Sequence, residues 1–192
     1  MNSIVRWRDT RAARSIPAAL LTAVAGIVLF ALAGLPLYVF PPVGQVDDAD
    51  LIYVIGPPTP ARIAYEEQLR RDGRADAALI SVSPEGERSA ADLSICANLA
   101  VTCESPLPFT TKGEAAMLTA YAREHDVKST IVITFTPHVA RTRYIFAKCY
   151  PGRVTVVGID EHLRPIDWVH QYLYQSAAFV KAIFTPCAPP VG

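Results

Sequence analysis

The residues best suited to chemistry follow an apolar run in the middle of the chain. Residues 131–133 are Ile-Val-Ile, a β-branched run typical of a buried parallel strand. Thr134 ends the run, and His138 and Arg141 follow on a predicted helix. Because residues 138 and 141 are three apart, the imidazole and the guanidinium share one face at the helix end that attracts anions. The pattern predicts an anion site. The alternative is that Arg141 and Arg143 are solvated and His138 only closes a turn.

The elements around this stretch alternate between strands and helices. The last predicted helix has an apolar stripe that includes Trp168, Tyr172 and Val180. This alternation predicts an α/β domain with one doubly wound, mostly parallel sheet of about five strands and helices on both faces. The predicted strands are 51–55, 78–82, 130–134 and 154–158, with a short one near 100–103. Three predicted helices are 60–71, 138–149 and 167–184. A fourth starts after Thr110 or Thr111 and ends near 125–126.

In such a sheet the loops after the strands meet at one edge, where open α/β sheets bind their ligands. Glu114 has two interpretations there: a capping-box acid for its own helix, or a pocket carboxylate that orients His138 or acts as a base. Arg141 could bind a phosphate or carboxylate through two hydrogen bonds. The candidate catalytic residues are His138 and Glu114, and the candidate ligand-binding residues are Gly56, Arg62, Ser81, Thr110, Thr111, Thr134 and Arg141.

Several short motifs carry a family resemblance. The strand, Thr, turn, His and Arg of 130–141 resemble the late motif of the YdcF/SanA/ElyC-like family. Residues 51–56 resemble its first strand ending in glycine, 78–83 its second strand, and 109–115 its Asn-Thr-x-Glu-Asn-Ala helix start. Three places depart from the family pattern: Gly56-Pro57-Pro58 replaces a glycine cluster, 83–86 replaces Gly-Gly, and Gly113 stands where the family has Glu.

The resemblance implies a role in cell-envelope biogenesis or barrier maintenance, with a small anionic, phosphate-bearing ligand. If the domain is an enzyme, phosphoryl or glycosyl-phosphate chemistry on an envelope precursor is expected, and envelope-biogenesis proteins are candidate partners. The alternative is a non-enzymatic binding or scaffold module with a vestigial pocket. No cofactor is expected.

The first forty residues indicate a membrane anchor. Four arginines precede the apolar run Ile16–Phe40, which exceeds the roughly 20 residues that a bilayer-spanning helix needs. Basic residues on this flank predict that residues 1–15 stay cytoplasmic, that 16–40 span the cell membrane once, and that the domain 50–192 follows a linker, 41–49, outside the cytoplasm. A cleavable signal peptide is the alternative, because 31–33 resembles a cleavage site.

Cysteine usage agrees with export. All four cysteines lie beyond the apolar run, at spacings that fit no common zinc pattern, and no metal site is expected. We predict that Cys96 pairs with Cys103 and Cys149 with Cys187, the second bond tying the C-terminal tail to the end of the His138 helix. Two other pairings, or four buried thiols, are the alternatives.

Net charge excludes one partner class. The formal net charge is zero, and no Lys/Arg-rich stripe follows the apolar run. Nucleic acid is therefore not an expected partner.

Overall fold

In the part of the chain that the structure describes, five strands form one parallel sheet with the order β3-β2-β1-β4-β5. The computed structural model describes residues 9–189, so Arg6 and Arg8 of the basic flank lie outside the described residues. The strands are β1 Leu51–Val54, β2 Ala78–Ser81, β3 Val101–Glu104, β4 Ser129–Phe135 and β5 Arg153–Ile159. The helices are α1 Asp9–Gly34, α2 Pro60–Arg71, α3 Thr111–Glu124, α4 Val139–Cys149 and α5 Pro165–Phe184.

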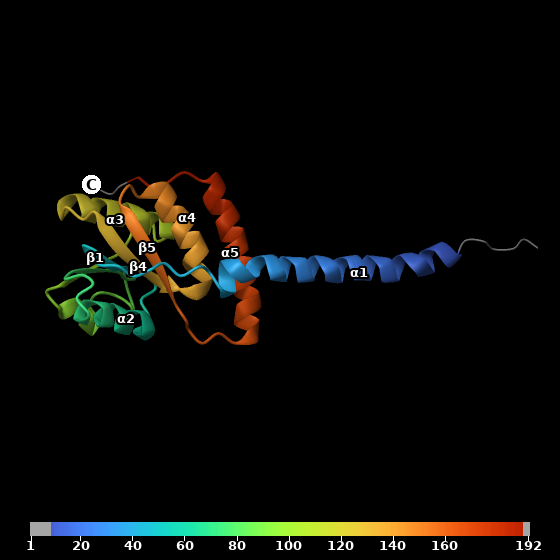
Figure 1. Ribbon diagram of the computed structural model, residues 1–192, viewed down its shortest axis with the longest axis horizontal. Helices are drawn as coiled ribbons and strands as arrows, with labels where there is room; N and C mark the ends of the chain where they lie inside the picture. The colour runs from blue at the N-terminus through green and yellow to red at the C-terminus, as the bar shows by residue number, and fades with distance from the viewer. Residues whose placement is uncertain (1–8, 190–192) are drawn as a thin grey trace, which may run out of the picture. The chain divides into compact units, whose positions relative to one another are not determined.

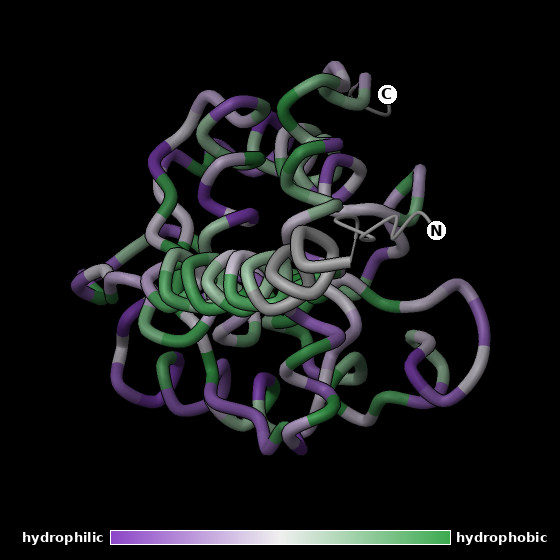
Figure 2. Tube along the Cα trace, turned by 90° about the vertical axis from the view of Figure 1, so that its right-hand side faces the viewer, coloured by the Kyte–Doolittle hydropathy of each residue, from purple (hydrophilic) through white to green (hydrophobic). Residues whose placement is uncertain are grey.

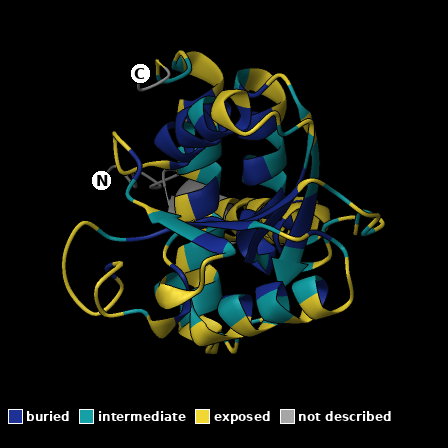
Figure 3. Ribbon diagram, turned by 90° about the vertical axis from the view of Figure 1, so that its left-hand side faces the viewer, coloured by how far each residue is buried: buried dark blue, intermediate teal, exposed yellow. Residues whose placement is uncertain are grey.

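Helices cover both faces of this sheet, which confirms the predicted doubly wound α/β class (Figure 1). On one face Tyr53, Leu79 and Val132 pack with residues of α3 and α4. On the other face Ile52, Ile80 and Ile131 pack with Leu69 of α2. Figure 3 shows the buried strands between helices whose outer surfaces are exposed. Successive strand residues alternate between the two faces and both faces are buried, which explains the continuous apolar runs in the sequence.

The predicted elements differ from the observed ones mainly at their ends. The helix Pro60–Arg71 has the predicted bounds, with Thr59 as its N-cap. The last helix begins at Pro165, two residues before the predicted start, and Asp167 caps it by accepting from the Arg164 N–H at 3.1 Å. Such shifts of one or two residues are ordinary at element ends.

Both predicted disulfides are present. The Cα–Cα distance is 5.7 Å for Cys96–Cys103 and 5.5 Å for Cys149–Cys187. The second bond joins the end of α4 to the segment after α5. Cysteines paired in this way fit an oxidising compartment outside the cytoplasm.

The chain divides into two compact units, one up to Leu35 and one from Pro36 onward. In the first unit α1 is followed by a short π-helical segment, Leu35–Val39, whose last residues belong to the second unit. The segment Ala18–Val39 is long and apolar enough to cross a membrane. A signal sequence can have the same length and composition. In Figure 2 much of α1 is coloured green, for hydrophobic residues, and its other turns are pale.

Candidate functional site

The candidate site lies at the carboxyl edge of the sheet, where the strand order reverses. β1 lies between β2 and β4. From β1 the chain continues to β2 and β3 on one side and then returns to the other side of β1 for β4 and β5. The end of β1 is joined to β4 by a hydrogen bond from Ile55 N to Ile133 O of 3.1 Å. Ligands of open α/β sheets bind at such a switch point. Gly56 lies two residues after β1, and Thr134 is the last residue but one of β4.

His138 is buried and held through both ring nitrogens. It is the N-cap residue of α4 and ends the short 3₁₀ turn Thr136–His138. Its Nδ1 lies 2.9 Å from the hydroxyl of Thr134, and its Nε2 lies 3.4 Å from the hydroxyl of Thr111. Burial first, and then the positive charges of Arg141 and Arg62, hold the pKa of His138 well below its usual value. The imidazole is therefore neutral at physiological pH, with one nitrogen as donor and the other as acceptor.

Glu114 crosses to the end of β1 and does not cap its own helix. Its Oε1 accepts a hydrogen bond of 2.6 Å from the backbone N–H of Gly56. Burial raises the pKa of the Glu114 carboxyl, opposed most by that N–H. The N-cap of α3 is Thr110, whose hydroxyl accepts from Gly113 N at 3.2 Å, so the capping-box interpretation of Glu114 is wrong.

Gly113, the residue before Glu114, has no room for a side chain. A Cβ atom at Gly113 would lie 1.8 Å from the carbonyl oxygen of Pro108. No side chain fits beside that backbone, so a glutamate at this position would require the loop before α3 to move.

Arg141 lies at the edge of the cluster, between α3 and α5. Its Nε donates to Oε1 of Gln175 at 2.9 Å, and its Nη1 lies 3.5 Å from the hydroxyl of Thr111. Its guanidinium lies 5.7 Å from the ring centroid of Tyr174. Within residues 9–189 its Nη2 has no hydrogen-bond partner, which leaves the two N–H groups of that nitrogen available to an anion.

Arg62 is also brought to this edge, where its Nε and Nη1 bind other parts of the protein. Its Nε pairs with Glu161 at 2.7 Å, and its Nη1 donates to the carbonyls of Ile55 and Pro57 at 3.3 and 3.0 Å. The side chain is buried over the ring of Phe135. Arg62 therefore holds the loops after β1 and β5 together.

Ser81 and Gly56 complete the inner part of the cluster. Ser81 is fully buried, and its hydroxyl has no hydrogen-bond partner of ordinary geometry among the described residues. A Cβ at Gly56 would lie 3.1 Å from that hydroxyl and 3.3 Å from Glu114 Oε1. The close approach of these three groups explains why β1 is followed by glycine.

Two residues that the sequence places near the site lie outside the cluster. Thr110 is exposed and serves as the cap of α3. Arg143 turns away from Arg141 and donates to the carbonyl of Val156 at 3.2 Å, so it is half-buried and not solvated. The structure thus brings together Gly56, Arg62, Ser81, Thr111, Glu114, Thr134, His138 and Arg141.

Three contacts had no clear signal in the sequence. Gln175 is buried and receives Arg141, although a polar residue on a predicted amphipathic helix is usually solvated. Glu161 follows β5, as expected of a residue at this edge, but nothing in its neighbours marks it as the partner of Arg62. Lys112 reaches the end of α5, where its ammonium donates to the carbonyl of Ala182 at 3.2 Å.

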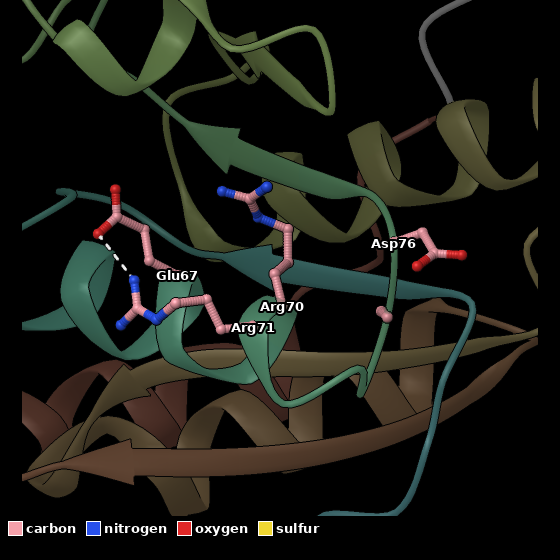
Figure 4. A pocket seen from close by; sticks show the side chains of 5 residues that line it. Glu67, Arg70, Arg71 and Asp76 are labelled. Carbon is pink, nitrogen blue, oxygen red and sulfur yellow. Dashed lines mark ion pairs between the residues drawn. The ribbon is translucent and has the colours of Figure 1, made fainter.

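Two surface hollows lie elsewhere. One, of about 350 Å³, is lined by charged residues at the end of α2, where Arg71 pairs with Glu67 at 3.8 Å (Figure 4). The other, of about 610 Å³, is lined by the linker 42–47 and by Arg143 with neighbouring residues of α4 and β5. Neither contains a residue of the His138 cluster. Among residues 9–189, no three His, Cys, Asp or Glu side chains lie close enough together to hold a metal ion.

No protein-family model, curated protein sequence or solved structure matches this chain. The function must therefore be argued from the site itself.

Proposed function

We propose that this chain is a membrane-anchored, extracytoplasmic domain of the YdcF/SanA/ElyC-like type that binds a small anionic, phosphate-bearing ligand. The ligand would lie at the rim of the His138 cluster, beside Arg141 and the start of α3. The proposed role is in cell-envelope biogenesis or barrier maintenance, as the motif resemblance implies.

The observation that carries this proposal is the contact of Glu114 with Gly56. A carboxylate that could have capped its own helix instead joins the ends of β1 and α3, 2.6 Å from a backbone N–H of the loop after β1. Burying a carboxyl group is costly, and here burial raises its pKa. Groups held at such cost gather at functional sites more often than elsewhere.

The chemistry of the rim suits an anion. Among the residues that the structure describes, Nη2 of Arg141 has no partner, and the first N–H groups of α3 carry the positive end of a helix dipole. If the domain is catalytic, the neutral imidazole of His138 could take up a proton and Arg141 would hold the developing negative charge. Both roles suit phosphoryl or glycosyl-phosphate chemistry.

A second function is supported by the contacts of His138 itself. Both of its nitrogens have protein partners, Thr134 and Thr111, and neither surface hollow reaches it. A histidine satisfied in this way is suited to a purely structural role, in which it holds the loops together. On this view the domain is a non-enzymatic binding or scaffold module for envelope proteins.

Two arginines of α4 provide a matched test. Inorganic phosphate, pyrophosphate and a prenyl phosphate should be titrated into the full chain in detergent micelles by calorimetry. Arg141→Ala should weaken binding by about ten- to a hundredfold, the equivalent of roughly 1.5–3 kcal/mol for a charge-assisted pair. Arg143→Ala should cost well under about 1 kcal/mol in binding, because its guanidinium faces Val156 and not the cluster.

Salt separates a specific site from a diffuse charge effect. The loss caused by Arg141→Ala should persist between low and high salt, since a partly buried pair is screened weakly. Equal losses for both variants that vanish together at high salt would contradict the proposed site. Failure of all three anions to bind would favour the scaffold function.

A further inference from the structure

The last helix carries its apolar residues on the outside. Five large apolar side chains of α5 are between 55 and 82% exposed, and Ala177 between them is exposed as well. At about 100° per residue these six positions fall within an arc of about 80°, along the whole length of the helix. We call them the outer stripe of α5: Ile166, Val169, Leu173, Ala177, Val180 and Phe184.

The opposite face of α5 is the one that packs on the domain. Gln175 and Ala182 are buried and lie about 160–180° from Ile166 around the helix. Gln175 meets Arg141 of α4, and Phe179 packs against Tyr144 of the same helix with ring centroids 5.2 Å apart. The outer stripe therefore points directly away from the domain. An exposed apolar row of this length is rare on a soluble surface that has no partner.

The end of the membrane-spanning segment is attached to this same helix. Tyr38 is buried, and its hydroxyl lies 2.8 Å from that of Ser176. Its ring meets Tyr172 edge-on at 5.1 Å. Both partners lie on the flank of α5 next to Val169, about 20–60° from the edge of the outer stripe. Since the apolar span ends at Val39, this contact holds α5 within roughly one helix diameter, about 10 Å, of the end of the span.

We propose that the outer stripe of α5 lies on the lipid bilayer, so that α5 is an interfacial helix in the plane of the membrane. All six residues can touch a flat apolar surface together only if the helix axis runs along that surface. On one side the stripe is bordered by the exposed side chains of His170 and Lys181. Apolar residues bordered by basic residues are typical of helices that bind anionic membranes. The proposal rests on the anchoring part of the proposed function but not on its ligand.

Brominated lipids give a direct test. The full chain, with its two native tryptophans replaced by phenylalanine, is reconstituted into vesicles of phosphatidylcholine and phosphatidylglycerol. A tryptophan is introduced by Leu173→Trp in the outer stripe or, as a matched control, by Leu99→Trp at an exposed loop position far from α5 in sequence. Bromine quenches indoles only at close range, so the indole at position 173 should lose more than about half of its fluorescence, and that at position 99 almost none.

Three outcomes would overturn the proposal, and they are distinguishable. If the protein stays in the vesicles after alkaline carbonate washing but the indole at position 173 is not quenched, the anchor holds and only the interfacial helix is refuted. If the protein is washed out, the anchor itself fails, and the proposed function fails with it. A photoreactive amino acid at position 180 provides an independent readout. Lipid adducts support the proposal, whereas a covalent dimer means that a second copy covers the stripe.

Discussion

Removal of Cys149–Cys187 should destabilise the domain more than removal of Cys96–Cys103. The two bonds span sequence separations of 38 and 7 residues. In the chain-entropy model, closing such loops lowers the entropy of the unfolded chain by an amount worth about 3.9 and about 2.4 kcal/mol at 25 °C. The expected difference of about 1.5 kcal/mol corresponds to roughly 3–6 °C in Tm for a domain of this size.

The contacts around the long loop strengthen this comparison. Lys148 donates to the carbonyls of Ile183 and Thr185 at 3.0 Å each, and Lys112 donates to that of Pro186 at 2.9 Å. These hydrogen bonds hold the segment after α5 whether or not the disulfide is present. The disulfide should therefore act mainly on the unfolded chain, which is the situation that the entropy model describes.

The assay is urea unfolding of the full chain in detergent micelles, followed by far-ultraviolet circular dichroism. The double variants C149A/C187A and C96A/C103A are compared with the wild type, and all three are repeated under reducing conditions, where the differences should shrink. Equal losses, or a larger loss for the short loop, would refute the entropic argument. The stabilisation would then come from packing of the folded protein around the short loop.

Three further variants test the polar cluster. Glu114→Gln should stabilise the fold at pH 7 but not near pH 4. Burial raises the pKa of Glu114 above the ordinary 4.5, so ionisation of this carboxyl costs stability as the pH rises. Urea midpoints at both pH values measure this difference. Thr134→Val should cost about 1–3 kcal/mol in the same assay, since it leaves a nitrogen of His138 buried without a partner. Gln175→Glu should weaken anion binding about tenfold by calorimetry, because a charged partner competes for Arg141.

Each of these variants has a contrary outcome. A pH-independent effect of Glu114→Gln would mean that the carboxyl is not destabilised by burial. An unchanged unfolding free energy for Thr134→Val would mean that water or another group satisfies His138. Unchanged or tighter anion binding by Gln175→Glu would remove Arg141 from the ligand site, because a carboxylate beside the guanidinium must repel an anion.

The fold could be predicted because its signal is local and repeated. Buried parallel strands require continuous apolar runs, and both 131–133 and 51–55 have them. Helix starts such as Thr59-Pro60 are also local, since a cap and the residue after it are sequence neighbours. Strand order depends on contacts between distant segments, and no local pattern in this sequence specifies it.

The role of Glu114 could not be predicted from spacing, because it depends on one residue. A capping box needs the acid three residues after the cap, and both Thr110 and Thr111 were candidate caps. The structure places the cap at Thr110, so Gly113 occupies the third position and Glu114 the fourth. From there the carboxylate reaches Gly56, 58 residues away in sequence. Only the folded arrangement distinguishes these two roles.

The last helix shows the same limit for amphipathic patterns. The sequence predicts an apolar stripe on this helix, and such a stripe normally packs on the core. In the structure Val180 and Phe184 are exposed, while the polar Gln175 is buried against Arg141. Periodicity locates an apolar face but does not identify what covers it. This helix also contacts Tyr38, more than 130 residues earlier in the chain, and no pattern within the helix predicts that contact.

The polar cluster and the outer stripe of α5 are connected through one helix. Gln175 holds Arg141 on the inner face of α5, and Tyr174, which lies 5.7 Å from the same guanidinium, is exposed at the border of the outer face. The position of α5 therefore determines where the guanidinium of Arg141 points. Lys112, Lys148 and the Cys149–Cys187 bond fix the far end of the helix, and Tyr38 fixes its middle. A shift of α5 would move Gln175 and with it Arg141, so the candidate site depends on the packing that holds this helix.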